Sequence, residues 1–516
     1  MFFQWLVAVT GIASILGVGR LLRDLWWQPW QICKRLQAQG VKGPPFIPIV
    51  GNLAELARLA QGTSTPMERS SHEIVHRLLP YCKTWSKLYG DTFVYTIGSE
   101  VRLTIADPGL IKEILSNKDF RKVSPNALVR DMFGNGLAVA EGEKWEQERR
   151  MLNPGFHVDK LKAMVETMSE LTTKMLNGWE RRIVRAKSPK GVQTVEIDVL
   201  EDYQNLTAEV ISHTAFGTSY EAGNRVFKLQ YFQQVMVAEA FKSMHLPGQS
   251  YLPTPKNLNR LKIRKTIEDK LRQIVEKRLQ QNETQHNDLL AIMISAYKSQ
   301  LLGNQKNLRM SIQDIVDECK TFFFAGHETT ASLLTWTTML LSLHPDWQER
   351  VRAEVMDICG RRTPTSGMLS QLKLVGMVLN EALRLYPATS VLTRCTERDM
   401  RLGKLMIPKG TVLLMHMLVT MHNKQLWGED ADNFSPERFS EGIAYAAKHP
   451  SAFMPFSIGP RSCIGQTFAL MEAKVVLCRL LQRFRFQLSP TYVHAPCQGF
   501  IIKPQYGMQI LLEPIG

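Results

Sequence analysis

The sequence predicts a mainly α-helical domain with small β-sheets, preceded by one N-terminal transmembrane helix. Three observations lead to this fold class. An uncharged apolar segment opens the chain, long runs with helical spacing of apolar residues dominate the rest, and few short segments alternate as strands do. The chain has 516 residues, of which 44% are apolar and 22% charged, and it shows no internal repeat. These values predict a large globular core rather than a disordered chain.

The first element is the expected membrane anchor, residues 1–19, which carry no charged side chain. A helix of this length spans roughly 30 Å, about the thickness of a bilayer core. Arg20, Arg23, Lys34 and Arg35 follow it, and no Lys or Arg precedes it. The positive-inside rule therefore puts the bulk of the chain in the cytosol. A cleaved signal peptide is the alternative, but this segment lacks the basic start and the small-residue cleavage site that such a peptide has.

The second element, residues 20–50, is predicted to be a basic and Pro-rich linker. Three tryptophans within residues 26–30 suit the headgroup level of a membrane. Residues 43–48 read Gly-Pro-Pro-Phe-Ile-Pro and are predicted to be non-helical, because proline lacks the amide hydrogen and restricts its predecessor. The main domain is expected to comprise residues 51–516.

Helical patterns dominate this domain, and strand signals are short. The predicted helices are 258–279, 310–343, 348–359 and 369–386, the last closed by a proline. The predicted strands are 92–97, 102–105, 412–417 and 508–512.

Charge and cysteine content narrow the possible functions. The formal net charge of +15 suits anionic membranes or acidic protein partners, and no nucleic-acid-binding motif is present, so we expect no nucleic-acid partner. The eight cysteines include no C-x-x-C pair and no short Cys/His cluster. A zinc site or a disulfide scaffold is therefore not expected, and reduced thiols facing the cytosol fit better.

One cysteine stands in a distinctive loop. Residues 456–465 follow the pattern F-x-x-G-x-R-x-C-x-G, with Cys463 as its cysteine. A thiolate donates electrons strongly to haem iron and favours cleavage of the O–O bond. Glycines permit a tight turn whose amides point at the sulfur, Phe456 can cover it, and Arg461 can meet a haem propionate. A buried structural cysteine is the usual alternative for a lone cysteine, but the surrounding pattern favours the iron ligand.

This loop resembles the haem-binding loop of the cytochrome P450 family, and other motifs of that family follow in order from about residue 40. The resemblance implies the cytochrome P450 fold and haem b bound through the Cys463 thiolate. It also implies electrons from NADPH through a separate membrane-bound reductase, and a single-pass location in the endoplasmic reticulum membrane.

Residues 317–330 resemble the family's A-G-x-[DE]-T-T motif within the predicted helix 310–343. By that resemblance Thr329 hydrogen-bonds the activated oxygen and Glu328 relays protons. Gly326 inside a helix costs about 1 kcal/mol against alanine, so a packing or functional reason is expected. His327 is interpreted as a packing residue or a neighbour of the site rather than a ligand.

Two further sets of charged residues match the family. Glu381 and Arg384 form E-x-x-R on one helix face, and the resemblance adds Arg438 from F-x-P-E-R-F as the third member of a buried triad. Trp145 and Arg149 match the W-x-x-x-R propionate motif.

Arg394 matches another propionate ligand of the family, beside Arg461. Arginine suits this task because its planar fork binds carboxylates in a bidentate manner.

Several blocks resemble a plant group that includes secologanin synthase, the cytokinin trans-hydroxylases and brassinosteroid-inactivating enzymes. Where those relatives often read Tyr-Pro-Pro, this chain has Tyr386-Pro387-Ala388, which puts their substrates in doubt. The predicted substrate pocket comprises Phe323, Phe324, Ala325, Val391, Leu392 and Phe500.

The expected activity is NADPH- and O2-dependent hydroxylation of a small lipophilic plant metabolite, of the hormone, terpenoid, steroid or fatty-acid class. Two alternatives stay open. One is a peroxide-rearranging P450 that needs no reductase, although such members typically lack the acid–Thr pair. The other is a haem-binding membrane protein without turnover. The sequence does not identify the substrate, because a pocket of dispersed apolar residues has no readable shape.

Overall fold

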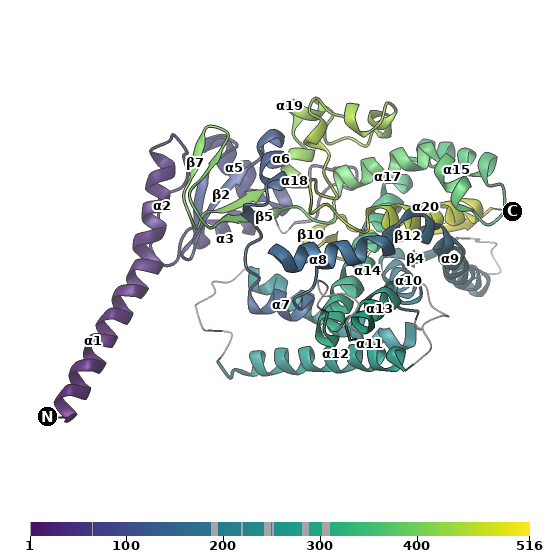
Figure 1. The fold of residues 1–516 in the computed structure, drawn as a ribbon. Coiled ribbons are helices and arrows are strands. Elements are labelled where there is room, and N and C mark those ends of the chain that lie inside the picture. The colour runs from purple at the N-terminus through teal and green to yellow at the C-terminus, as the bar shows by residue number, and fades with distance from the viewer. Residues whose placement is uncertain are drawn as a thin grey trace.

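The helices of this computed structural model gather around a long central helix, while the larger sheet lies toward the N-terminal side (Figure 1). The structure describes residues 2–63, 65–186, 194–217, 220–241, 249, 252–280, 288–301 and 310–515. The helices of the first half are α1 (Phe2–Leu22), α2 (Gln28–Gln37), α3 (Leu53–Gln61), α4 (Val75–Leu78), α5 (Pro80–Tyr89), α6 (Pro108–Ser116), α7 (Ala127–Phe133), α8 (Gly142–Leu152), α9 (Val158–Ala186), α10 (Val199–Phe216) and α11 (Tyr220–Phe241). Those of the second half are α12 (Pro255–Leu279), α13 (Leu289–Leu301), α14 (Ile312–Leu343), α15 (Pro345–Ile358), α16 (Ser366–Gln371), α17 (Lys373–Leu385), α18 (Met417–Met421), α19 (Lys424–Trp427) and α20 (Gln466–Arg483).

The strands are few and short, as predicted. They are β1 (Val94–Ile97), β2 (Glu100–Ile105), β3 (Phe120–Arg121), β4 (Val195–Asp198), β5 (Leu392–Thr396), β6 (Met400–Leu402), β7 (Leu405–Ile407), β8 (Val412–Met415), β9 (Phe484–Leu488), β10 (Pro496–Gln498), β11 (Ile502–Pro504) and β12 (Gln509–Pro514). The largest sheet has the order β1-β2-β8-β5-β3, and only its β2–β8 pair is parallel among the strand pairs of the described residues. A mainly helical fold with small sheets is thus confirmed, and the four predicted strands correspond to β1, β2, β8 and β12.

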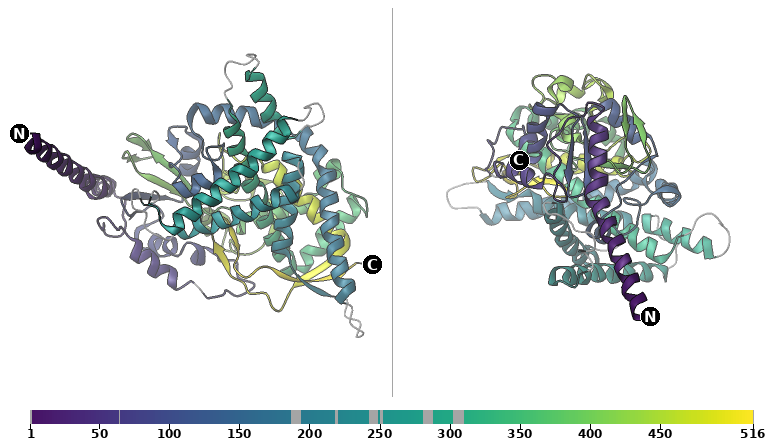
Figure 2. Two further views of the ribbon diagram at one scale, coloured as in Figure 1. Left: turned by 90° about the horizontal axis from the view of Figure 1, so that it is seen from below. Right: turned by 90° about the vertical axis from the view of Figure 1, so that its left-hand side faces the viewer.

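The N-terminal helix α1 projects away from the body of the molecule in all three views (Figures 1 and 2). Its described large apolar side chains, such as Trp5 and Ile15, are exposed. Met1 and the side chains of residues 4 and 6–9 lie outside the described part. Over the residues that are described, no helix reaches the length and hydropathy of a candidate membrane span.

Part of the predicted linker is helical. A five-residue π-helical turn, Arg23–Trp27, joins α1 to α2. In α2, Ile32, Cys33 and Leu36 are buried, and the helix packs against β1, β2 and β7. The predicted linker of residues 20–50 therefore contains a segment held by the domain, whereas residues 43–48 are non-helical as expected.

Helix α14 runs through the core and positions the acid–Thr motif. It matches the predicted helix 310–343, and its start is fixed by a capping box in which Ser311 and Asp314 each bind the other's backbone amide. The helix is α-helical through Gly326. A Cβ added at Gly326 would lie 2.8 Å from Cγ1 and Cδ1 of Ile211, on α10. Close packing of α10 on α14 is therefore the structural reason for this glycine.

Candidate active site

The loop before α20 holds Cys463 in a tight turn. The amide of Cys463 donates to the carbonyl of Phe456 at 2.9 Å, which closes the loop. Gly459 has φ +79°, and a Cβ there would lie 2.5 Å from the carbonyl oxygen of Leu115, so only glycine fits. The sequence motif and the turn geometry thus agree.

The Cys463 thiol lies between opposing influences. Burial raises its pKa, whereas a hydrogen bond from the Gly465 amide and the positive charge of Arg149 act to lower it. The residue as a whole is exposed. Protein atoms therefore crowd the sulfur without enclosing the residue, which suits a ligand atom that faces a bound group. A coordinated metal ion would deprotonate such a thiol.

Four cationic side chains gather near this loop. They are Lys122, Arg149, Arg394 and Arg461, and the ion pairs of the described residues place one carboxylate, that of Glu141, against them at 2.8 Å from Arg461 Nη2. Burial, followed by the charges of Arg461 and Arg394, lowers the pKa of Lys122 to about 7. Burial and the charge of Arg461 lower the pKa of Arg394 to about 10. The cluster therefore has surplus positive charge that an anionic group would relieve.

Backbone carbonyls also hold two of the arginines of this cluster in place. Arg149 Nη1 donates to the Ser462 carbonyl at 2.9 Å, and Arg461 Nη1 donates to the Ala140 carbonyl at 2.8 Å. The guanidinium of Arg461 also lies 4.2 Å from the ring centre of Trp145. Trp145, Arg149 and Arg461 are thus brought together beside Cys463. A planar group with two carboxylates, such as haem, fits both the surplus charge and the thiol.

The acid–Thr pair lies on α14 as expected. Thr329 Oγ1 donates to the carbonyl of Ala325 at 2.7 Å. Gln204, on α10, donates through Nε2 to both oxygens of Glu328 at 3.3 and 3.2 Å. Burial acts to raise the pKa of Glu328, but the hydrogen bond and charge of His327, with the charge of Lys503, outweigh it and lower the pKa to about 2. Glu328 is therefore ionised near neutral pH.

The predicted pocket residues separate into groups. Phe324 and Phe500 pack edge-on at 5.3 Å between ring centres, and each also contacts Phe133, at 5.1 and 5.4 Å. Met132, Val237 and Ile501 complete this small apolar cluster, with Ala388 against it. The structure therefore brings Phe324 and Phe500, two of the predicted pocket residues, into one apolar cluster.

The other predicted wall residues lie elsewhere. Phe323 is fully buried and stacks on Phe216 at 4.3 Å, so it faces α10 and the main core rather than Phe324. Successive residues on a helix are about 100° apart, which explains the separation. Val391, just before β5, and Leu392, its first residue, are half-buried against the main core.

The charge triad assembles around the fully buried Glu381 and Arg384, and the Arg438 side chain is 10% exposed. Arg384 donates to both oxygens of Glu381, from Nε and Nη2, at 2.7 Å each. Arg438, from the 3-10 turn Pro436–Phe439, has Nε 3.6 Å from Glu381 Oε1. The amide of Ser435 donates to the same oxygen at 2.9 Å. The E-x-x-R and F-x-P-E-R-F motifs therefore meet in space.

Sequence reasoning missed Lys122, Glu141, Gln204 and Lys503. None stands in a motif that was recognised, and each reaches its partner from a distant part of the chain. The excess of positive charge around Arg394 can be recognised only once the fold shows which charged residues lie next to it. In the sequence these four residues do not differ from other polar residues, and only tertiary packing places them at the site.

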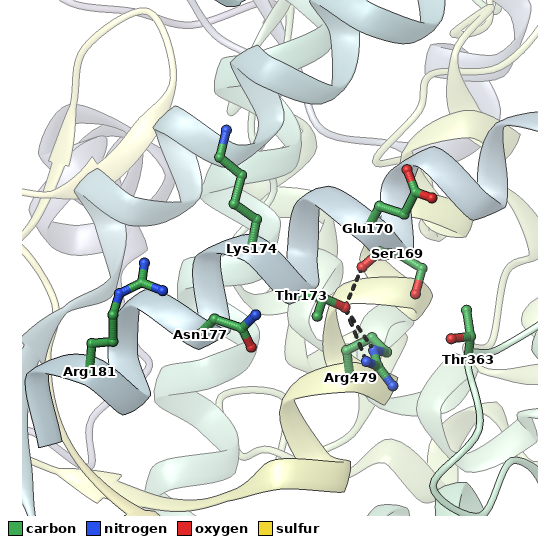
Figure 3. Close-up of a pocket in the computed structure, with 8 residues that line it drawn as sticks. All are labelled: Ser169, Glu170, Thr173, Lys174, Asn177, Arg181, Thr363 and Arg479. Atoms are coloured by element: carbon green, nitrogen blue, oxygen red, sulfur yellow. Dashed lines mark hydrogen bonds between the residues drawn. The ribbon is translucent and has the colours of Figure 1, made fainter. Parts of the chain in front are cut away.

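A separate surface pocket of about 420 Å³ lies between α9 and α20 (Figure 3). Its lining includes Thr173, whose hydroxyl accepts from Arg479 at 3.0 Å. It shares no residue with the groups around Cys463 or Glu328, so it is not the candidate active site.

Comparison with known proteins decides the family. The model of the family Cytochrome P450 matches residues 41–512. The chain belongs to the cytochrome P450 family. It is 42% identical over 500 residues to Cytochrome P450 709B1 of Arabidopsis thaliana, covering 95% of both chains. It is also 42% identical over 515 residues to Cytochrome P450 734A1 of the same plant, covering 98% of this chain and 96% of the relative. Cytochrome P450 CYP72A616 of Paris polyphylla is 41% identical over 495 residues, with 95% and 94% covered.

Membership makes the chain a monooxygenase of the oxidoreductase class, with haem iron held by a thiolate. The similar plant P450s do not specify its substrate.

Proposed function

We propose that this P450 hydroxylates a small lipophilic plant metabolite, with Cys463 as the iron ligand and NADPH as the source of electrons. The observation that carries the haem site is the surplus of positive charge on buried and half-buried side chains beside the Cys463 loop. Haem b, when bound, supplies the oxygen-activating iron. The hormone, terpenoid, steroid and fatty-acid classes are the candidate substrates, because the cluster around Phe324 and Phe500 is apolar.

The chain's own residues would hold haem in two ways. The Cys463 thiolate, kept in its turn by the carbonyl of Phe456, would be the iron ligand. Arg149, Arg394 and Arg461 would bind the propionates, with Trp145 stacked on Arg461. Lys122 would join them and stay protonated once the propionates compensate its neighbours.

Proton delivery is assigned to α14. Glu328 would relay protons inward and Thr329 would hold a hydrogen-bonding hydroxyl beside it, as a general acid pair requires. Gln204 fixes the Glu328 carboxylate from α10. The presence of this acid–Thr pair favours monooxygenation over peroxide rearrangement.

Location and partner complete the proposal. We infer a single-pass anchor at residues 1–19 in the endoplasmic reticulum membrane, with the domain facing the cytosol. The exposed apolar side chains of α1 and the basic residues that follow support it. The electron donor would be NADPH–cytochrome P450 reductase, whose acidic docking face suits a net charge of +15.

Spectral titration is the test for substrate. The full chain in lipid nanodiscs is titrated with hormones, terpenoids, steroids, fatty acids and alkaloids. We expect a Soret shift with one class and, with reductase, substrate-dependent NADPH consumption and a hydroxylated product. Turnover of hydroperoxides without reductase would favour the rearrangement alternative. Haem binding without any turnover would favour a non-catalytic haem protein.

A further inference from the structure

His327 precedes the acidic residue of α14 and is almost fully buried, with 4% of its surface exposed. Aromatic rings fix its orientation. Phe227, on α11, packs edge-on against it at 4.8 Å, and Phe324 does so at 6.4 Å. These contacts hold the imidazole ring in one orientation, in which its two nitrogens face different partners.

The hydrogen bonds of His327 define its tautomer. Nδ1 lies 2.5 Å from the carbonyl oxygen of Phe323. A carbonyl oxygen only accepts, so Nδ1 carries a hydrogen and donates it. The other nitrogen, Nε2, lies 3.4 Å from Oε1 of Glu328. Nε2 is therefore the atom that gains or loses a proton, and it faces the carboxylate.

A proton between these two atoms is required by their chemistry. An unprotonated Nε2 and a carboxylate oxygen are both acceptors, and two acceptors in contact in a buried site repel each other. Gln204 donates to both oxygens of Glu328 and Lys503, on β11, adds positive charge, so both favour the carboxylate. One proton between Nε2 and Oε1, which lie 3.4 Å apart, would therefore join the pair.

We propose that His327 is a positioning residue for proton delivery, whose Nε2 holds the proton that Glu328 passes to the Thr329 side of α14. This rests on the proposed role of Glu328. In the step, the Nε2–H bond breaks and an O–H bond forms on Glu328, which leaves a neutral imidazole and a neutral carboxylic acid. The acid then gives its proton onward, and Nε2 regains one from solvent.

The other charged and titratable groups around the pair are few among the described residues. Lys503 faces Glu328 from β11, and its ammonium lies 4.7 Å from the ring centre of Tyr231, on α11. From α10 the pair meets the neutral amide of Gln204. Changing His327 should therefore shift the ionisation of Glu328 strongly, and changing Lys503 should shift it less.

The direct test is infrared spectroscopy of the Glu328 carboxyl in the full-length haem-loaded protein. The carboxylic-acid C=O band that disappears in Glu328→Gln identifies this group. We expect no such band in the unmodified protein from pH 5 to pH 8. In His327→Gln, which keeps a polar side chain but has no charge, burial of Glu328 is no longer offset, so the band should appear within that range. Lys503→Met should give a smaller shift in the same direction. Identical titrations in His327→Gln and the unmodified protein would overturn the proposal.

A matched control separates this role from packing. His416 is also fully buried against an aromatic ring, Tyr81 at 5.8 Å, but forms no ion pair with a carboxylate in the described structure. His416→Gln should leave the Glu328 band unchanged.

Turnover gives a second readout. In His327→Gln, product formed per NADPH should fall about tenfold or more, with peroxide released instead and a changed pH profile. An unchanged ratio and pH profile would count against the role. The infrared titration needs no turnover, so absence of monooxygenase activity in the unmodified protein would refute the proposed function and leave the proton test intact.

Discussion

Replacing Glu381 by alanine probes the buried charge triad. Glu381 and Arg384 are both 0% exposed, and two hydrogen bonds of 2.7 Å join them. In Glu381→Ala the guanidinium of Arg384 keeps carbonyl partners, those of Met421, Ala431 and Asn433. It loses the negative charge, and the amide of Ser435 loses its acceptor.

The expected loss follows from burial. Removing one partner of a fully buried ion pair costs about 3–5 kcal/mol, because the other charge is left uncompensated. This is a large share of a total stability of about 5–15 kcal/mol. Glu381→Gln keeps an acceptor oxygen, so its effect should be smaller, about 1.5–3 kcal/mol for the lost charged hydrogen bonds.

A matched control lies in the same region. Glu437 pairs with Arg350 at 2.7 Å, but both side chains are about half exposed, at 52% and 45%. Glu437→Ala should therefore cost about 0–1 kcal/mol. Haem content per protein, from the Soret absorbance, and urea unfolding followed by circular dichroism measure both variants. We expect Glu381→Ala to fail to hold haem and Glu437→Ala to hold it normally. A normal haem spectrum in Glu381→Ala would refute this reasoning.

Three further predictions concern other buried groups. Burial raises the pKa of Glu148, which is paired with Glu318, to about 7. The folded state thus keeps a proton that the unfolded chain loses above pH 4.5, so the free energy of unfolding should fall from about pH 4.5 to pH 7. In Glu148→Gln, urea unfolding should show a smaller fall over this pH range. An equal dependence of the unfolding free energy on pH in both proteins would contradict this. Lys122→Met should speed haem transfer to apomyoglobin about tenfold or more, because a charged hydrogen bond to a propionate is lost, and an unchanged rate would exclude that contact. Gly326→Ala should destabilise the protein by steric contact with Ile211, as thermal unfolding would show, and Ile211→Ala should restore part of the loss.

Local signals account for what the sequence predicted well. Helix 310–343 was predictable because its helical pattern continues up to the proline at position 345. The charge triad was predictable because Glu381 and Arg384 share a helix face. The short strands were predictable from runs of β-branched and apolar residues.

Tertiary packing accounts for the features that the sequence did not predict. Helix α2, in the predicted linker, was not predicted because a ten-residue helix is only marginally stable alone. Burial of Ile32 and Leu36 against the domain stabilises it. Lys122 became significant only when the fold placed it beside Arg394 and Arg461. His327 was interpreted as a packing residue or a neighbour of the site, and residue spacing does not show the hydrogen bond to Phe323 that defines its tautomer.

The most direct test of the central claim is the carbon-monoxide spectrum of the reduced full-length protein with and without Cys463. Cys497, a half-buried thiol in β10, provides the matched control. The unmodified protein and Cys497→Ala should both show the red-shifted Soret band that a thiolate ligand produces. Cys463→Ala should lack that band and form no product with NADPH and reductase. Retention of the thiolate band and of turnover in Cys463→Ala would contradict the assignment of Cys463 as the iron ligand.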